Sequence, residues 1–272
     1  MKSFLRKSLE EKYLPMTTKT ALITGGTSGI GLGIATKFAS EGFNLLLNGL
    51  EKEGPDICAD LAKKYAVKVI YSNANLLKPT EITKMISDGE ASLGGFDVLV
   101  NNAGIQFVAP IEEFPDEKWE MIIGINLSAS FYSCKAVWKG MKARKSGRII
   151  NIASAHGLVA SEFKSAYVAA KHGLVGLTKV LALEGGAFGI TVNAICPGYV
   201  KTPLVDKQIS DQAKAHGISE EEVVNKIMLS EQAIKQFTPV PAIADLAFYL
   251  TGDQSKTITG ASLSIDGGWT AH

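Results

Sequence analysis

The stretch TALITGGTSGIG, residues 20–31, decides the fold of this 272-residue chain. Residues 20–24 are mostly apolar and predict a short buried strand. A glycine-rich turn follows at once, and Ile34 and Phe38 then begin a helical pattern. A strand, a glycine turn and a helix in this order place a phosphate group against the first turn of the helix. We therefore predict a dinucleotide site here, although a purely structural turn would show a similar glycine pattern.

Strand and helix patterns alternate along the rest of the chain. Strands are predicted at residues 44–48, 67–71, 96–100, 148–152, 191–195 and 261–265, and helices at residues 79–93, 119–145, 167–183 and 242–250. This rhythm predicts an α/β fold with one Rossmann-type domain, residues 19–272, built on a doubly wound parallel sheet of about seven strands. Residues 202–241 interrupt the rhythm and are predicted to form a helical lid over the substrate. Residues 1–18 are predicted to form an N-terminal extension.

Composition argues against several classes of function. The 28 Lys and Arg residues and the 27 Asp and Glu residues are spread along the chain, so no nucleic-acid-binding surface is expected. No apolar run approaches the ~20 residues of a membrane helix, so no membrane partner is expected either. Cys58, Cys134 and Cys196 are widely separated, and neither they nor the four histidines have metal-binding spacing. We expect a cytoplasmic protein with reduced thiols and no metal site.

Tyr167 and Lys171 form a candidate acid–base pair. Residues four apart share one face of a helix, so the phenol and the ammonium should be neighbours. The ammonium favours the phenolate, although lowering a tyrosine pKa by ~2 units from about 10 requires roughly 3 kcal/mol. Ser154 follows the strand at residues 148–152 and is placed to hydrogen-bond the reacting oxygen. The alternative is an ordinary solvated helix face, which the serine and the upstream glycine turn argue against.

Taken in order, these motifs resemble the short-chain dehydrogenase/reductase family. The resemblance extends from about Lys19 to Trp269, and its motifs comprise Gly25, Gly29, Gly31, Asn101, Asn102, Ala103, Gly104, Asn126, Ser154, Tyr167, Lys171, Pro197 and Gly198. It implies that Tyr167 is the general base and that Ser154 holds the reacting oxygen. It also implies that Lys171 grips the nicotinamide ribose and that Asn126 supports a water leading protons out of the site.

The same resemblance implies a nicotinamide cofactor. Contacts with it are expected from Gly25, Thr27, Gly29, Ile30, Gly31, Leu50, Asn75, Leu76, Asn102, Ala103, Gly104, Tyr167, Lys171, Pro197, Gly198, Val200 and Thr202. Asn75 stands where relatives often carry an Asp near the adenine, so a charged contact is not expected there.

The second predicted strand bears on the choice between NAD and NADP. An acidic residue at its end would bind the adenosine ribose of NAD, but Glu51 is displaced from that place and could simply be solvated. No arginine follows the strand or lies in the glycine turn to bind a 2′-phosphate. The balance favours NAD.

A closer resemblance, to the bacterial D-3-hydroxybutyrate dehydrogenases, is carried by residues 105–111, 154–160, 163–173 and 266–269. It implies that the substrate carboxylate is held by Gln106, His156, Lys164 and Gln208. It also implies that Trp269 lines the substrate pocket, in its own chain or in a neighbouring subunit. Independently of the family, two potential cations, Lys164 and His156, beside the reacting groups suit a small anionic hydroxy acid.

Together these resemblances imply a homotetrameric, NAD-dependent enzyme that interconverts D-3-hydroxybutyrate and acetoacetate. One alternative is another reductase of the same family, acting on a 3-oxoacyl group or a sugar. A second alternative is a non-catalytic protein that senses the cofactor. That alternative would be expected to have lost part of the set formed by Ser154, Tyr167 and Lys171, all of which are present.

Overall fold

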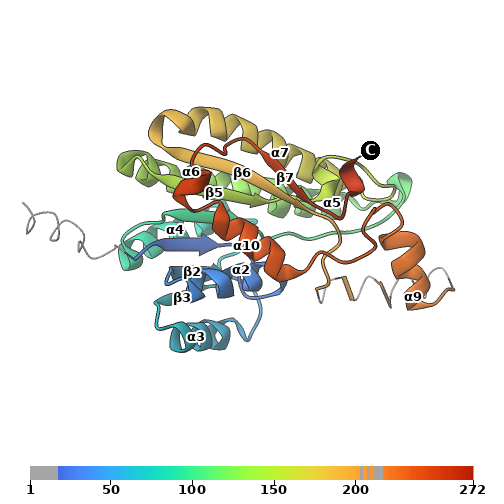
Figure 1. Cartoon of the computed structure of the whole chain (residues 1–272), viewed down its shortest axis with the longest axis horizontal. Coiled ribbons are helices and arrows are strands. Elements are labelled where there is room, and N and C mark those ends of the chain that lie inside the picture. The colour runs from blue at the N-terminus through green and yellow to red at the C-terminus, as the bar shows by residue number, and fades with distance from the viewer. Residues whose placement is uncertain (1–17, 203–204, 207–208, 211–212, 214–216, 272) are drawn as a thin grey trace, which may run out of the picture.

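A seven-stranded sheet forms the centre of the molecule, in the strand order β3-β2-β1-β4-β5-β6-β7 (Figure 1). The computed structural model describes residues 18–202, 205–206, 209–210, 213 and 217–271. The strands are β1 Thr20–Ile23, β2 Asn44–Asn48, β3 Val69–Ser72, β4 Val98–Asn101, β5 Gly147–Ile152, β6 Ile190–Pro197 and β7 Ser262–Ile265. All neighbouring strands are parallel, and the order reverses between β1 and β4. The predicted doubly wound Rossmann-type sheet is confirmed.

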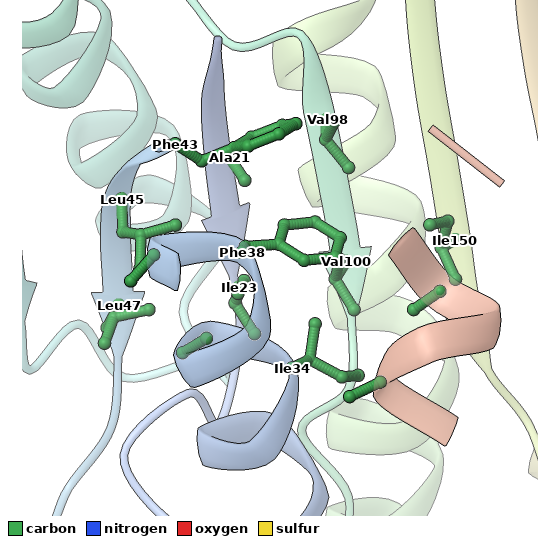
Figure 2. Close-up of a cluster of buried hydrophobic side chains, with 14 of the residues drawn as sticks. Ala21, Ile23, Ile34, Phe38, Phe43, Leu45, Leu47, Val98, Val100 and Ile150 are labelled. Atoms are coloured by element: carbon green, nitrogen blue, oxygen red, sulfur yellow. The ribbon is translucent and has the colours of Figure 1, made fainter. Parts of the chain in front are cut away.

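Both faces of the sheet are covered by helices because successive strand residues point to opposite sides. Ala21 and Ile23 of β1 belong to one buried cluster, which Figure 2 shows from within. The helices of that face are α2 Gly29–Ser40, α3 Gly54–Tyr65 and α10 Val240–Tyr249. Leu22, between those two residues, belongs to the cluster on the other face. The helices there are α4 Pro79–Leu93, α6 Ala129–Arg144 and α7 Ser165–Gly185.

The helix predicted at residues 119–145 is not one regular helix. It consists of α5 Asp116–Ile123, a wider π-helical turn over Gly124–Ser128, and α6. Turns of this kind insert one residue into a helix and often occur at functional sites. Helix α3 was not predicted at all. The short helical turns are Ile111–Glu113, Ala155–Gly157, Gly186–Phe188, Asp253–Ser255 and Trp269–Ala271.

The segment predicted as a lid has a hydrophobic cluster of its own. Among its described residues are helix α9 Glu220–Glu222 and a π-helical turn over Val223–Met228. Val205, Ile209, Val223, Met228 and Leu229 pack together, separately from the two sheet clusters. Helix α9 lies beyond the carboxyl ends of the strands (Figure 1). Apart from residue 18, the N-terminal extension lies outside the described residues.

Within the described parts of the chain, no helix combines the length and the apolar character that crossing a membrane requires.

Candidate active site

A pocket at the carboxyl end of the sheet brings together side chains from three consecutive parts of the chain. Ser154 follows β5, His156 lies in the next short helical turn, and Tyr167 and Lys171 are on α7. Trp269, near the C-terminus, closes the same pocket. The structure therefore assembles residues that the sequence predicts on separate grounds.

A hydrogen bond to the end of β5 fixes the side chain of Lys171. Its ammonium nitrogen donates a hydrogen bond of 2.7 Å to the carbonyl oxygen of Ile152, the last residue of β5. The same nitrogen lies 5.6 Å from the centre of the Tyr167 ring. Lys171 is almost fully buried, and burial lowers its pKa to about 8. The predicted proximity of the phenol and the ammonium is therefore present in the structure.

The predicted lowering of the Tyr167 pKa is not found among the protein's own groups. Burial raises this pKa above its ordinary value of 10.0, because it disfavours the charged phenolate. The hydrogen bond with Ser154 lowers it by less, and Tyr199 raises it further. The prediction rests on the positive charge of Lys171, whereas the folded chain also removes the phenol from water.

Asn126 lies in the π-helical turn and is buried. Its side-chain oxygen accepts a hydrogen bond from the backbone nitrogen of Ile105 at 2.9 Å, and its side-chain nitrogen donates to the carbonyl oxygen of Ile105 at 2.9 Å. Both ends of the amide are thus used to hold the loop that follows β4. Asn126 is fixed beside the site by this loop, and its proton-relay role stays a prediction.

His156 is not the second cation that the sequence suggests. Burial, together with the nearby charges of Lys164 and His172, lowers its pKa to about 3, so the ring is neutral at pH 7. One ring nitrogen, Nε2, lies 2.9 Å from the hydroxyl of Ser161. The other, Nδ1, lies 3.5 Å from the hydroxyl of Ser154. His156 can therefore offer a neutral hydrogen-bonding group, and the positive charge of this part of the pocket comes from Lys164.

Trp269 is placed by the turn that follows β7. Both carboxylate oxygens of Asp266 accept hydrogen bonds in this turn, one from the backbone nitrogen of Gly268 and the other from Thr270. The indole then packs edge-on against His156, with ring centres 4.9 Å apart. Trp269 thus lies in the pocket of its own chain. A neighbouring subunit is not needed to supply it.

Hydrogen bonds join the glycine turn after β1 to the turn after β4. The side-chain nitrogen of Asn102 donates 3.0 Å hydrogen bonds to the carbonyl oxygens of Thr24 and Gly25. Gly25 has a φ of +60°, which a residue with a side chain rarely adopts. A Cβ at Gly31 would overlap the carbonyl oxygen of Gly25, so α2 can approach the turn only with a glycine there. These contacts leave the start of α2 open toward the site.

Glu51 is not a solvated side chain. Its carboxylate accepts hydrogen bonds from the hydroxyls of Thr27 and Ser28, the latter at 2.6 Å. Burial alone would raise its pKa, but the hydrogen bonds from Ser28 and Thr27 outweigh burial and lower it. Ser28 precedes α2 and its hydroxyl makes no cap to that helix. The glycine turn therefore carries a fixed negative charge that the sequence argument discounted.

The other predicted residues lie in several different surroundings. Gln106, Lys164, Ile30, Gly104, Pro197, Gly198, Val200 and Thr202 line the pocket. Gly29 is the first residue of α2 and Ala103 lies in the turn after β4, whereas Leu50 is 73% exposed. Asn75 uses its side-chain oxygen to accept from the nitrogen of Leu77, and Leu76 packs against the core. Gln208 lies outside the described residues.

Sequence reasoning missed Tyr199, which also lines this pocket. A tyrosine directly after the Pro197–Gly198 pair was the available signal. Among the residues that the structure describes, no group of three or more His, Cys, Asp or Glu side chains could hold a metal ion.

Comparison with known proteins gives consistent results. The model of the family described as short chain dehydrogenase matches residues 19–213. A protein of Rhizobium meliloti (strain 1021) named D-beta-hydroxybutyrate dehydrogenase is 54% identical over 259 residues, covering 94% of this chain and 100% of the relative. A protein of the same name from Cupriavidus necator is 48% identical, covering 93% of this chain and 98% of the relative.

A solved structure is also similar to this one. It is a variant of actinorhodin polyketide ketoreductase with NADPH, with a TM-score of 0.88 and 33% sequence identity. The match covers 94% of this chain and 98% of that chain.

Proposed function

Because this chain belongs to the short chain dehydrogenase family, we propose that it catalyses the reversible, NAD-dependent oxidation of D-3-hydroxybutyrate to acetoacetate. The observation that carries the proposal is the pocket itself. It joins Ser154, Tyr167 and Lys171 to a buried lysine, Lys164, that can bind a carboxylate. The relatives named D-beta-hydroxybutyrate dehydrogenase support the choice of substrate.

The residues around the glycine turn fit a dinucleotide. The uncapped start of α2 can bind a pyrophosphate, and Gly31 lets α2 approach the glycine turn closely. Asn102 holds the two turns in this arrangement in advance. The cofactor would supply the acceptor for the hydride from C3 of the substrate, and its oxidised nicotinamide would add a positive charge. Lys171 and Tyr167 would bind the adjoining ribose.

The chain's own residues would move the proton. Tyr167, as the phenolate, takes the proton of the C3 hydroxyl onto its oxygen, and Ser154 hydrogen-bonds the same substrate oxygen. Burial raises the pKa of Tyr167, so Ser154 and the local positive charge are needed to bring the phenol into a useful range. In the reverse direction the phenol returns the proton to the carbonyl oxygen of acetoacetate.

Lys164 and His156 would select the carboxylate. Lys164 is 8% exposed, and a buried ammonium favours an anionic partner. Neutral His156 would donate or accept a hydrogen bond, and Gln106 lines the same pocket. Gln208 stays a prediction for this role. We expect Lys164→Ala to raise the KM for D-3-hydroxybutyrate strongly while leaving the KM for the cofactor nearly unchanged.

Glu51 supports NAD over NADP. Its carboxylate is held by the hydroxyls of Thr27 and Ser28, in the turn that would receive the adenosine side of the cofactor. A carboxylate can accept hydrogen bonds from ribose hydroxyls, but it repels a 2′-phosphate. The solved ketoreductase with NADPH shows that the family also includes proteins seen with the other cofactor.

Residues 202–241 would serve as the lid. Their hydrophobic cluster is separate from the sheet clusters, and Tyr199, which lines the pocket, packs against it. We also propose that residues 19–272 form a single catalytic domain.

We also propose a cytoplasmic homotetramer. Helices α6 and α7 carry exposed apolar side chains, among them Phe131, Val180 and Leu183. Such side chains on long helices are suited to contact between subunits. Cys58, Cys134 and Cys196 are free and buried, which fits a reducing compartment. Sedimentation analysis of the purified protein tests the subunit number.

Steady-state assays test the function directly. The absorbance of the reduced nicotinamide would be followed with D- and L-3-hydroxybutyrate, each with NAD and with NADP. We expect turnover of the D acid with NAD. A parallel assay with NADPH and a 3-oxoacyl thioester examines the reductase alternative. If neither cofactor is reduced by the D acid, the proposed function is wrong.

A further inference from the structure

Tyr199 lies between the pocket and the hydrophobic cluster of the lid segment. Its backbone is held from two directions. Its carbonyl oxygen accepts a hydrogen bond of 2.8 Å from the nitrogen of Thr238. The preceding residue, Gly198, donates from its backbone nitrogen to the carbonyl oxygen of Ile265 at 3.1 Å. The Tyr199 ring therefore starts from a well-defined position.

The ring is held as firmly as the backbone. It stacks on Trp269 with ring centres 5.5 Å apart and planes only 7° from parallel. Trp269 in turn packs edge-on against His156. Offset stacking and edge-on contact are the favourable arrangements for aromatic pairs. These contacts leave the Tyr199 hydroxyl pointing to a fixed place in the pocket.

That hydroxyl meets the ammonium of Lys164. The Lys164 nitrogen donates a hydrogen bond of 3.0 Å to the Tyr199 hydroxyl oxygen and lies 5.3 Å from the centre of the ring. No carboxylate forms a salt bridge with Lys164 in the part of the chain that the structure describes. A lysine has a flexible four-carbon chain, so its charge is located by whatever its ammonium binds.

The start of α7 brings Lys164 to this place. Lys164 immediately precedes the helix, three residues before Tyr167. Phe163, the residue before it, has a φ of +64°, which is unusual for a bulky side chain. The carbonyl oxygen of Phe163 accepts a hydrogen bond of 3.0 Å from the nitrogen of Ala109. The chain thus turns sharply just before Lys164, and the lysine is buried.

We propose that Tyr199 is a positioning residue for substrate binding. Its hydroxyl accepts one of the three hydrogens of the Lys164 ammonium and leaves the others for the substrate carboxylate. Tyr199 thereby sets the distance between the bound carboxylate and Tyr167, where the C3 hydroxyl must react. Its packing against the lid cluster links this distance to the lid segment. The inference rests on the proposed function.

The test compares Tyr199→Phe with the unaltered enzyme. The substitution removes one oxygen atom and keeps the ring that stacks on Trp269. We expect the KM for D-3-hydroxybutyrate to rise about ten-fold, because a hydrogen bond to a charged group is lost. The KM for NAD should stay within about two-fold. Tyr249→Phe, which removes an exposed hydroxyl on α10, is the matched control and should change nothing.

Two further measurements show whether Tyr199 acts through Lys164. In a Lys164→Met background, Tyr199→Phe should have no additional effect on the KM for the acid. The methyl ester of D-3-hydroxybutyrate has no carboxylate. For this ester, the Tyr199→Phe enzyme and the unaltered enzyme should have the same KM. A merely structural role would raise both values.

The outcomes separate the two proposals. If the unaltered enzyme oxidises D-3-hydroxybutyrate but Tyr199→Phe leaves its KM unchanged, the inference is wrong and the proposed function stands. An additive effect in the Lys164→Met background would also overturn the inference. If the unaltered enzyme does not oxidise the acid, both fall together.

Discussion

The ammonium of Lys171 lies 5.6 Å from the centre of the Tyr167 ring while it is bound to the end of β5. The two residues are neighbours, yet burial raises the pKa of Tyr167 and lowers the pKa of Lys171, so it favours the neutral form of each. In this arrangement Lys171 is a positive charge beside the phenol, and the proposed contact with the ribose would come from the same ammonium. Tyr167, the proposed proton acceptor, should be indispensable for catalysis.

We expect Tyr167→Phe to lower kcat by about 10²–10⁴-fold, the usual contribution of a general base. The ring stays in place, so the dissociation constant for NAD should change by less than about three-fold. Steady-state kinetics and fluorescence titration measure the two quantities. Tyr249→Phe should keep full activity. A Tyr167→Phe enzyme with more than a tenth of the normal kcat would show that another group accepts the proton.

Gly31→Ala should weaken NAD binding at least ten-fold. The new methyl group would overlap the carbonyl oxygen of Gly25 and force α2 away from the glycine turn. Gly186→Ala is the matched control, because a Cβ there meets open space and its backbone is right-handed helical. The control should bind NAD normally and be about as stable as the parent, or more stable by up to about 1 kcal/mol. Equal NAD affinity in the two variants would contradict the assignment of this turn.

Glu51→Gln should improve the use of NADP. The substitution keeps the size of the side chain and removes the charge that would repel a 2′-phosphate. We expect the ratio of kcat/KM for NADP to that for NAD to rise about ten-fold or more. Glu53→Gln makes the same change of charge two residues away, on an exposed side chain. If the ratio shifts equally in both variants, net charge rather than Glu51 is responsible.

His156 should make the protein less stable in mild acid. An unfolded histidine takes up a proton below pH 6.5, whereas folded His156 stays neutral down to about pH 3. Between these values the unfolded state binds more protons, so the free energy of unfolding falls as the pH falls. The loss from this residue should reach about 2 kcal/mol at pH 5.

Denaturant unfolding at pH 7 and pH 5 measures this effect. His156→Gln should lose less stability between the two pH values than the parent, because glutamine does not titrate. The carboxylates contribute equally in both proteins, and their effect cancels in the comparison. Identical pH dependence in His156→Gln and the parent would contradict the neutral buried ring.

The strands and the glycine turn could be predicted because each has a local signal. Buried parallel strands are short apolar runs, and the turn after β1 needs glycine at fixed places. Helix α4 was predicted with its observed limits, Pro79–Leu93, since a proline begins it and a glycine follows it. Helix α3 was missed, although Pro55 in its first turn was an available signal.

Some features could not be predicted because they depend on contacts between distant residues. The π-helical turn at Asn126 is accompanied by hydrogen bonds to the backbone of Ile105, 21 residues away. The neutral state of His156 depends on its burial, and the position of Glu51 depends on two hydroxyls in another turn. Sequence patterns identify such residues but do not show what surrounds them.

The stacking of Trp269 on Tyr199 also gives the protein a built-in optical reporter. Trp269 is the indole that lines the pocket, whereas Trp119 and Trp138 belong to α5 and α6. Indole emission responds to nearby charge and can pass its energy to a reduced nicotinamide. The arrival of a carboxylate beside Lys164, and the formation of reduced cofactor, would therefore change the light emitted by the same residue. A Trp119→Phe, Trp138→Phe protein would isolate that emission and follow each turnover without a label.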